Sequence, residues 1–339
     1  WYQRINVAIK SGELPDFFKA DVEQFRLLQN SGSLADLTEA YESTASDALK
    51  ELLYSSGPTA MASATVDGKL LGIPFTEMPR EGAPILMIRK DWMDRLNLEA
   101  PKTFDDVRKI AAAFVNNDPD GNGVDDTIGI GLDNNIFFNT SSTAWQGMNA
   151  AFGVQPTIWV KNSEGKLEYG SIQPKMRDYL IALSDMYKQN LLYKDILKVD
   201  FSGLETQVIN EKCGLYFQPF HAPANALQVL HNLTPEAEWA YYPIPTVDGS
   251  KPQIPVGSGV NCYWVVREGF QDPEAIIKML NLYVDYQYGV YETEEELERV
   301  GKGMMEGKDG NLWKMSAVQA FTDFNNLERY HLMNDYLKN

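Results

Sequence analysis

The segment of residues 66–104, VDGKLLGIPFTEMPREGAPILMIRKDWMDRLNLEAPKTF, decides the fold that we predict for this chain. It opens with a turn in which Gly68 is free to take a positive φ angle. The apolar runs 70–74 and 84–88 predict two short strands. Pro74 ends the first strand because proline cannot donate a hydrogen bond to a sheet.

Two helices are predicted in the second half of this segment. Arg89-Lys90-Asp91-Trp92 opens the first, and Thr103 followed by Asp106 has the spacing of a capping box at the start of the second. Elsewhere, 159–170 has the pattern of a hairpin, and 175–189 is a clear amphipathic helix. Short apolar runs alternate with helical stretches, which favours βαβ units and a mostly parallel sheet.

Composition restricts the class of protein. The 339 residues are enough for two ordinary domains, and a hydrophobic content of 44% supports a substantial core. The net charge of −17 excludes nucleic acid as a partner, because phosphates require basic patches. It also argues against a polyanionic ligand, unless a local basic pocket overrides the global field. No apolar run approaches the length of a membrane span.

The sequence holds no recognisable catalytic motif. It lacks a G-x-S-x-G elbow, an HExxH helix, a P-loop and a dinucleotide fingerprint. A glycosidase would need two carboxylates that flank a cleft, and none of the many acids stands in such a motif. We therefore predict that the protein is not an enzyme. The only cysteines, Cys213 and Cys262, are far apart, and their spacing leaves open whether they pair.

The order of these features resembles the extracellular solute-binding proteins of ABC importers. It is most similar to the lipoprotein branch that includes alginate- and pectin-fragment-binding proteins. The resemblance extends to about Tyr288. The residues that carry it are Asp67, Gly68, Lys69, Gly72, Pro74, Arg89, Lys90, Asp91, Trp92, Leu96, Pro101, Lys102, Thr103 and Phe104.

This resemblance implies an α/β, two-lobe periplasmic-binding-protein-like fold of type II, with a ligand cleft between the lobes. It also implies that a signal peptide, a lipid-modified cysteine and a first strand precede Trp1. Because the sequence stops inside an apparent helix, 322–337, we also expect that part of the tail is missing. The expected division is 1–88 plus 261–301 for lobe one, 89–260 plus 302–339 for lobe two, and hinges near 86–92 and 256–262.

Sugar-binding sites combine aromatic side chains, which stack on the apolar faces of the rings, with planar polar groups, which bind the hydroxyls. Each aromatic candidate has core packing as its alternative. An exposed ion pair is the alternative for the two charged candidates, and a structural role the alternative for the histidine. The candidates at predicted strand ends are Glu77, Arg80, Trp145, Gln146, Gln218, Phe220, His221, Ser258 and Asn261.

A second candidate site is the acidic loop that begins at Asp118. The spacing matches the first half of a calcium loop, but the twelfth position is Gly129 and a strand follows instead of a helix. The loop resembles the calcium loop of the alginate-binding branch, except that Thr127 stands where that branch has glutamate. The alternative is an acidic turn without metal. The predicted Ca²⁺ ligands are Asp118, Asp120, Asn122, the carbonyl of Val124, and Asp126.

The resemblance implies an extracytoplasmic receptor that binds a carbohydrate, an oligosaccharide in particular. Such a receptor delivers its ligand to permease subunits in the membrane. It is expected to be a monomer that is lipid-anchored on the outer face of a bacterial membrane. A receptor of the same fold for a peptide or other small solute, and a carbohydrate-active enzyme, remain alternatives. The sequence does not name the sugar.

Overall fold

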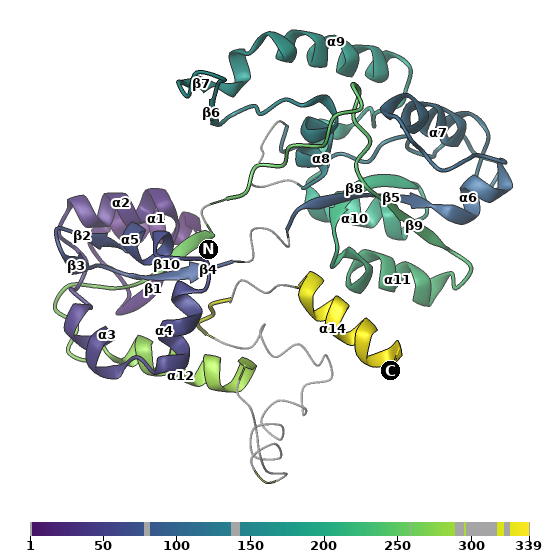
Figure 1. Ribbon diagram of the computed structural model, residues 1–339. Coiled ribbons are helices and arrows are strands. Elements are labelled where there is room, and N and C mark those ends of the chain that lie inside the picture. Colours follow the sequence, from purple (N-terminus) through teal and green to yellow (C-terminus); the bar gives the residue numbers. More distant parts are fainter. Residues whose placement is uncertain are drawn as a thin grey trace. The chain divides into compact units, whose positions relative to one another are not determined.

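The computed structural model describes residues 2–77, 82–136, 143–257, 259–288, 295, 317–321 and 326–338 (Figure 1). The chain divides into two compact units. Unit 1 comprises Trp1–Arg80 and Gly257–Asn339, and unit 2 comprises Glu81–Val256. Each unit has its own hydrophobic core.

Unit 1 is built around a three-stranded antiparallel sheet in the order β1-β10-β4. Its central strand, β10, comes from the second half of the chain, so the sheet joins segments that are remote in sequence. The elements of this unit are α1 (Tyr2–Ser11), β1 (Phe17–Ala20), α2 (Val22–Asn30), α3 (Thr38–Thr44), α4 (Asp47–Tyr54), α5 (Thr59–Ala64), β2 (Thr65–Val66), β3 (Lys69–Leu70), β4 (Ile73–Thr76), β10 (Val260–Val266), α12 (Ala275–Tyr288) and α14 (Asn326–Lys338).

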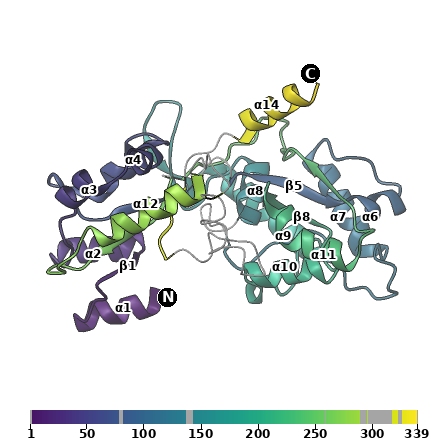
Figure 2. The same ribbon diagram turned by 90° about the horizontal axis from the view of Figure 1, so that it is seen from below.

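Helix α12 is fastened to the N-terminal half of unit 1. The side-chain amide of Asn281 donates to the carbonyl of Thr44 at 2.8 Å and accepts from the backbone N–H of Ser46 at 2.9 Å. It thereby satisfies backbone groups where α3 ends and α4 begins. Helix α12 accordingly lies beside α3 and α4 (Figures 1 and 2).

Unit 2 contains the sheet β8-β5-β9, in which the central strand β5 pairs antiparallel with both neighbours. Helix α8 packs against β5 and β8. The elements of this unit are β5 (Pro84–Arg89), α6 (Lys90–Arg95), α7 (Phe104–Asn116), α8 (Thr143–Phe152), β6 (Trp159–Lys161), β7 (Leu167–Tyr169), η1 (Gly170–Ile172), α9 (Pro174–Lys188), η2 (Ile196–Lys198), α10 (Phe201–Ile209), β8 (Leu215–Pro219), η3 (Ala222–Ala224), α11 (Ala226–Leu233) and β9 (Trp239–Tyr242).

Two local predictions are confirmed, whereas the predicted end of the first strand and the predicted strand direction are wrong. Strand β4 continues through Pro74, which lies opposite Tyr263 of β10, and ends at Thr76. Thr103 and Asp106 form the capping box of α7, and β6 and β7 form the predicted hairpin. The expected parallel sheet is not found: every strand pair in the described residues is antiparallel, and parallel pairing is confined to isolated bridges such as Ile128 with Cys213. The reason is that β5 pairs with strands distant in sequence, which local alternation cannot reveal.

The unit boundaries fall at Arg80/Glu81 and at Val256/Gly257. Strand β5 therefore belongs entirely to unit 2. The sequence assigned 302–339 to the second lobe, of which 302–316, 322–325 and 339 lie outside the described residues. Val318 and Ala320, by contrast, are buried in the core of unit 1. The backbone N–H of Phe321 donates to the carbonyl of Thr76 at 3.1 Å, which fastens this segment to β4.

Cys213 and Cys262 are free and buried, and burial raises the pKa of each thiol to about 12. This answers the question that their spacing left open.

Among the described helices, none combines the length and the apolar character that crossing a membrane requires.

The start of α6 holds a buried charge. Arg89, only 2% exposed, donates from Nε and Nη2 to the two carboxylate oxygens of Asp91 at 2.8 and 2.7 Å. Nη2 also donates to Glu211 at 3.1 Å. The guanidinium lies over the ring of Trp92, 4.6 Å from its centre. Arg89, Asp91 and Trp92 therefore form one packed cluster, and Glu211 joins it to the loop before β8.

Substituting Arg89 by methionine tests this cluster. Arg89→Met leaves two carboxylates facing each other without a counter-charge, and we expect it to lower the free energy of unfolding by about 2–4 kcal/mol. The measurement is urea unfolding. Lys90→Met is the control, because Lys90 pairs with Asp94 at the surface and should barely move the midpoint. Equal midpoints for the two variants would contradict a stabilising role for Arg89.

Candidate functional site

One group of candidates lies at the carboxyl end of β8 in unit 2. Gln218 is buried within the strand, opposite Ile85 of β5. Phe220 follows the strand and is 46% exposed, and its ring meets that of His221 edge-on with centroids 5.5 Å apart. Partial desolvation lowers the pKa of His221, which favours the neutral imidazole near pH 7. This strand end thus offers an exposed aromatic face beside groups that donate and accept hydrogen bonds.

Helix α8 contributes Gln146, whose side-chain amide donates to the carbonyl of Pro255 at 3.0 Å. The helix can lie this close to β8 because Gly147 faces Phe217: a Cβ atom there would come within 2.3 Å of the phenyl ring. Gln146 is therefore positioned by a close approach of the helix to the sheet.

Trp145, the neighbour of Gln146, packs in the core of unit 2. It is only 3% exposed, and its indole Nε1 donates to the backbone carbonyl of Asp133 at 2.7 Å. This geometry leaves no ring face for a sugar and corresponds to the core-packing alternative. The stacking role expected for Trp145 is therefore not supported by its position.

The second group lies in unit 1, where β4 ends beside the start of β10. The amide of Asn261 donates to the Glu77 carboxylate at 2.5 Å, and the backbone N–H of Glu77 donates to the carbonyl of Gly259 at 2.9 Å. Glu77 thus has an amide partner. Arg80 and Ser258, the remaining candidates, lie outside the described residues.

The acidic loop follows α7 and curls on itself. Asp118 accepts from the backbone N–H groups of Asn122 and Gly123 at 3.1 and 2.9 Å. The amide of Asn122 donates to Asp120 at 2.7 Å and to Asp126 at 3.3 Å. Asp118, Gly121 and Gly123 all adopt positive φ angles, which bend the chain around these oxygens. Side-chain oxygens of the type that hard cations prefer therefore face one another across the loop.

Lys212 is the residue of this region that sequence analysis missed. Its ammonium lies 2.8 Å from the Asp126 carboxylate, and this hydrogen bond is the main cause that lowers the pKa of Asp126. Burial, reinforced by Asp118, instead raises the pKa of Asp120. Lys212 belongs to a distant segment, so nothing in the spacing of the loop could indicate it.

The donor set of the loop fits a hard divalent cation in chemical type and in order along the chain. It is not assembled as a finished metal centre, since no three acidic, histidine or cysteine side chains of the described residues form a group that could hold one. The Thr127 hydroxyl turns away and donates to the carbonyl of Phe114 at 2.6 Å. Asp126 is bound to Lys212. A cation that used all the predicted ligands would have to share Asp126 with that ammonium or displace the ammonium.

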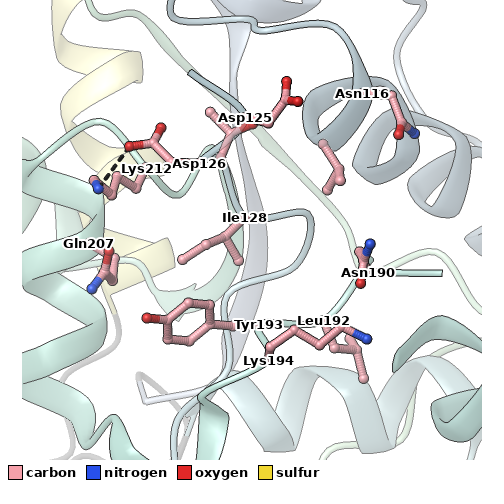
Figure 3. Close-up of a pocket in the computed structure, with 12 residues that line it drawn as sticks. Asn116, Asp125, Asp126, Ile128, Asn190, Leu192, Tyr193, Lys194, Gln207 and Lys212 are labelled. Carbon is pink, nitrogen blue, oxygen red and sulfur yellow. Dashed lines mark ion pairs between the residues drawn. The ribbon is translucent and has the colours of Figure 1, made fainter. Parts of the chain in front are cut away.

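A cavity of about 610 Å³ adjoins the end of this loop. Figure 3 shows Asp126 and Lys212 paired at its rim, with Ile128, Gln207 and Tyr193 around it. Ile128 forms a parallel bridge with Cys213, just before the start of β8, whereas Gln218 lies near the opposite end of that strand. The cavity and the candidate ligand residues of unit 2 are therefore separate places in the same unit.

Comparison with known proteins defines the class. The bacterial extracellular solute-binding protein family matches residues 1–288, and the chain belongs to that family. A polygalacturonan/rhamnogalacturonan-binding protein of Bacillus subtilis is 29% identical over 219 residues, which cover 63% of this chain and 41% of that protein. A fructooligosaccharide ABC transporter substrate-binding protein of Streptococcus pneumoniae is 25% identical over 230 residues, with the same coverage. The chain thus matches about two fifths of each relative's length.

Solved structures agree on the fold. The alginate-binding protein AlgQ2 has a TM-score of 0.69 at 18% identity, covering 95% of this chain and 68% of that one. The fructooligosaccharide-binding protein of S. pneumoniae, in complex with kestose, has a TM-score of 0.66 at 22% identity, covering 86% and 61%. These likenesses confirm the predicted α/β fold of two-lobe solute-binding proteins.

The burial of Trp145 generates a prediction about stability. Trp145→Ala should lower the free energy of unfolding by about 3–5 kcal/mol, because it empties a packed site and leaves the Asp133 carbonyl without its donor. Trp159→Ala is the control, since Trp159 is 65% exposed in the β6–β7 hairpin. Urea unfolding measures both. An unchanged midpoint for Trp145→Ala, together with weaker sugar binding, would restore the stacking interpretation.

Proposed function

We propose that the protein is the extracytoplasmic solute receptor of an ABC importer and that its ligand is an oligosaccharide. The observation that carries this proposal is the family membership of residues 1–288, together with two relatives that are named for pectin-fragment and fructooligosaccharide binding. Receptors of this kind bind their solute without converting it, so we propose no catalytic role.

The net charge of −17 favours a neutral sugar over a uronic acid polymer. The candidate residues that the structure describes agree with this, since none of them is a lysine or an arginine. In unit 2, Phe220 would stack on a ring face while Gln146, Gln218 and His221 bind hydroxyls. In unit 1, Glu77 and Asn261 would do the same.

The proposed partners are the permease subunits of the importer, with the receptor acting as a monomer. We further propose that a lipid anchor holds it on the outer face of a bacterial membrane. A relative named as a lipoprotein, LipO of B. subtilis, supports the anchor and is 27% identical over 216 residues. A peptide or another small solute is the alternative ligand within the same fold.

Calorimetry on the full-length protein tests the ligand class. The panel comprises neutral oligosaccharides, oligogalacturonides, monosaccharides and short peptides, and we expect saturable binding of at least one neutral oligosaccharide. Binding of peptides alone would overturn the carbohydrate assignment. Preference for oligogalacturonides would overturn the charge argument while leaving the receptor proposal intact.

Phe220 offers a sharper test once a ligand is in hand. Phe220→Ala should weaken binding by about 1–3 kcal/mol, the scale of one aromatic stacking interaction and the apolar area that it buries. It should leave stability nearly unchanged. Phe201→Ala is the matched control, because Phe201 in α10 is 41% exposed, close to the 46% of Phe220. Equal affinities for wild type and Phe220→Ala would remove Phe220 from the site.

We also propose that loop 118–126 holds one structural Ca²⁺ through Asp118, Asp120, Asn122, the Val124 carbonyl and Asp126. Two similar solved proteins support this: the S. pneumoniae protein has been solved as an EF-hand mutant, and AlgQ2 has been solved without calcium ion. The ion would neutralise carboxylates that repel one another and would fix the connection between α7 and the segment at Ile128.

If the loop holds Ca²⁺, then after chelation millimolar Ca²⁺ should raise the Tm of wild type by mass action on the folded state, and more than Mg²⁺ does. Asp120→Ala should abolish this shift. Sugar affinity should stay nearly constant, because the loop and the residues at the end of β8 are separate places in unit 2. If millimolar Ca²⁺ leaves the wild-type Tm unchanged, the loop is a metal-free acidic turn.

A further inference from the structure

We propose that Lys212 is the internal counter-cation of loop 118–126 and that it competes with a divalent ion for Asp126. The first half of this proposal concerns the metal-free protein and stands on geometry alone. The second half rests on the proposed calcium function. It makes Lys212 the residue that sets how tightly the loop binds its metal.

The ion pair between Lys212 and Asp126 is the first observation that supports this role of Lys212. Lys212 Nζ lies 2.8 Å from Asp126 Oδ2, and among the described residues this is the one salt bridge that any of the three predicted carboxylate ligands makes. Asp118 and Asp120 are held instead by backbone N–H groups and by the amide of Asn122. The Arg95 guanidinium also lies at the loop, where it donates to the carbonyl of Pro119. Lys212 therefore supplies the positive charge that pairs directly with a loop carboxylate.

The backbone fixes where Lys212 stands. Its carbonyl accepts from the N–H of Ile128 at 2.6 Å, and its own N–H donates to the carbonyl of Gln207 at 2.9 Å. Ile128 comes only two residues after Asp126, so the pairing of Ile128 with the segment at Lys212 and Cys213 sets the lysine beside the loop. Figure 3 shows the ammonium and the carboxylate facing each other at the rim of the cavity.

Competition with a metal follows from charge and from geometry. The ammonium contacts Oδ2 of Asp126 at 2.8 Å, and Oδ1 accepts from the Asn122 amide at 3.3 Å, so a cation would have to share the carboxylate with these donors or displace one of them. The ammonium would in addition repel a divalent ion across a few ångströms, although solvent screens part of this repulsion because both side chains are partly exposed. Removing the ammonium should therefore raise the affinity for metal.

A matched control lies on the same cavity. Lys194 also lines it, but its ammonium contacts the carbonyl and the ring of Tyr187. Lys194→Met therefore removes the same charge and the same donor from the same cavity wall without removing a partner of the loop. Lys212→Arg keeps the charge next to Asp126, whereas Lys212→Met keeps the apolar stem and removes only the charge.

The experiment measures Tm in chelator and Ca²⁺ affinity by calorimetry on the full-length protein. In chelator, Lys212→Met should melt below wild type, while Lys212→Arg and Lys194→Met should melt near it. With metal, Lys212→Met should bind Ca²⁺ about three- to tenfold more tightly than wild type, and Lys194→Met should not. Asp120→Ala should bind no Ca²⁺, whether it is introduced into wild type or into Lys212→Met.

The two halves of the proposal can fail separately. If Lys212→Met is destabilised in chelator but neither it nor wild type binds Ca²⁺, the calcium function is wrong and the counter-cation role stands. If Lys212→Met and Lys194→Met behave alike in chelator, the counter-cation role is overturned. If Ca²⁺ binds wild type and Lys212→Met equally well, the competition is overturned.

Discussion

The fold of unit 2 depends on keeping one positive charge buried. The Arg89 guanidinium is held by both oxygens of Asp91, by Glu211 and by the face of Trp92. Burying the charge with fewer partners would lower the free energy of unfolding by several kcal/mol, so the folded state requires all of these side chains to be in contact. Because Arg89 ends β5 and Glu211 precedes β8, meeting that requirement sets the end of the central strand and brings the neighbouring strand to it.

The same constraint extends from the cluster to the candidate ligand residues. The N–H of Arg89 donates to the carbonyl of Gly214 at 2.8 Å, and a Cβ atom on Gly214 would come within 2.4 Å of the Trp92 ring. The glycine lets β8 start directly against the tryptophan. With that start fixed, the register of β8 on β5 determines where Gln218 lies and where the chain turns toward Phe220.

How much of the structure could be predicted from the sequence depends on how far apart the interacting residues lie along the chain. The α7 capping box and the β6–β7 hairpin involve residues a few positions apart, and both were predicted from sequence and confirmed. Strand direction, the burial of Trp145 and the ion pair between Lys212 and Asp126 all depend on segments that meet only in the folded chain. No local pattern contains that information. The family resemblance supplied the overall fold, because it records long-range pairing that periodicity does not.

Arg89 and Lys212 show two ways in which this acidic chain uses a cation. The Arg89 guanidinium is removed from water and held by two carboxylates and a ring, and replacing it by a mobile ion would require opening the core. The Lys212 ammonium is partly solvated and meets a single carboxylate at the edge of a loop. Such a pair is screened by solvent and is held less firmly than a buried one. The first cation is therefore a fixed part of the fold, whereas the second occupies a position that a metal ion could take over.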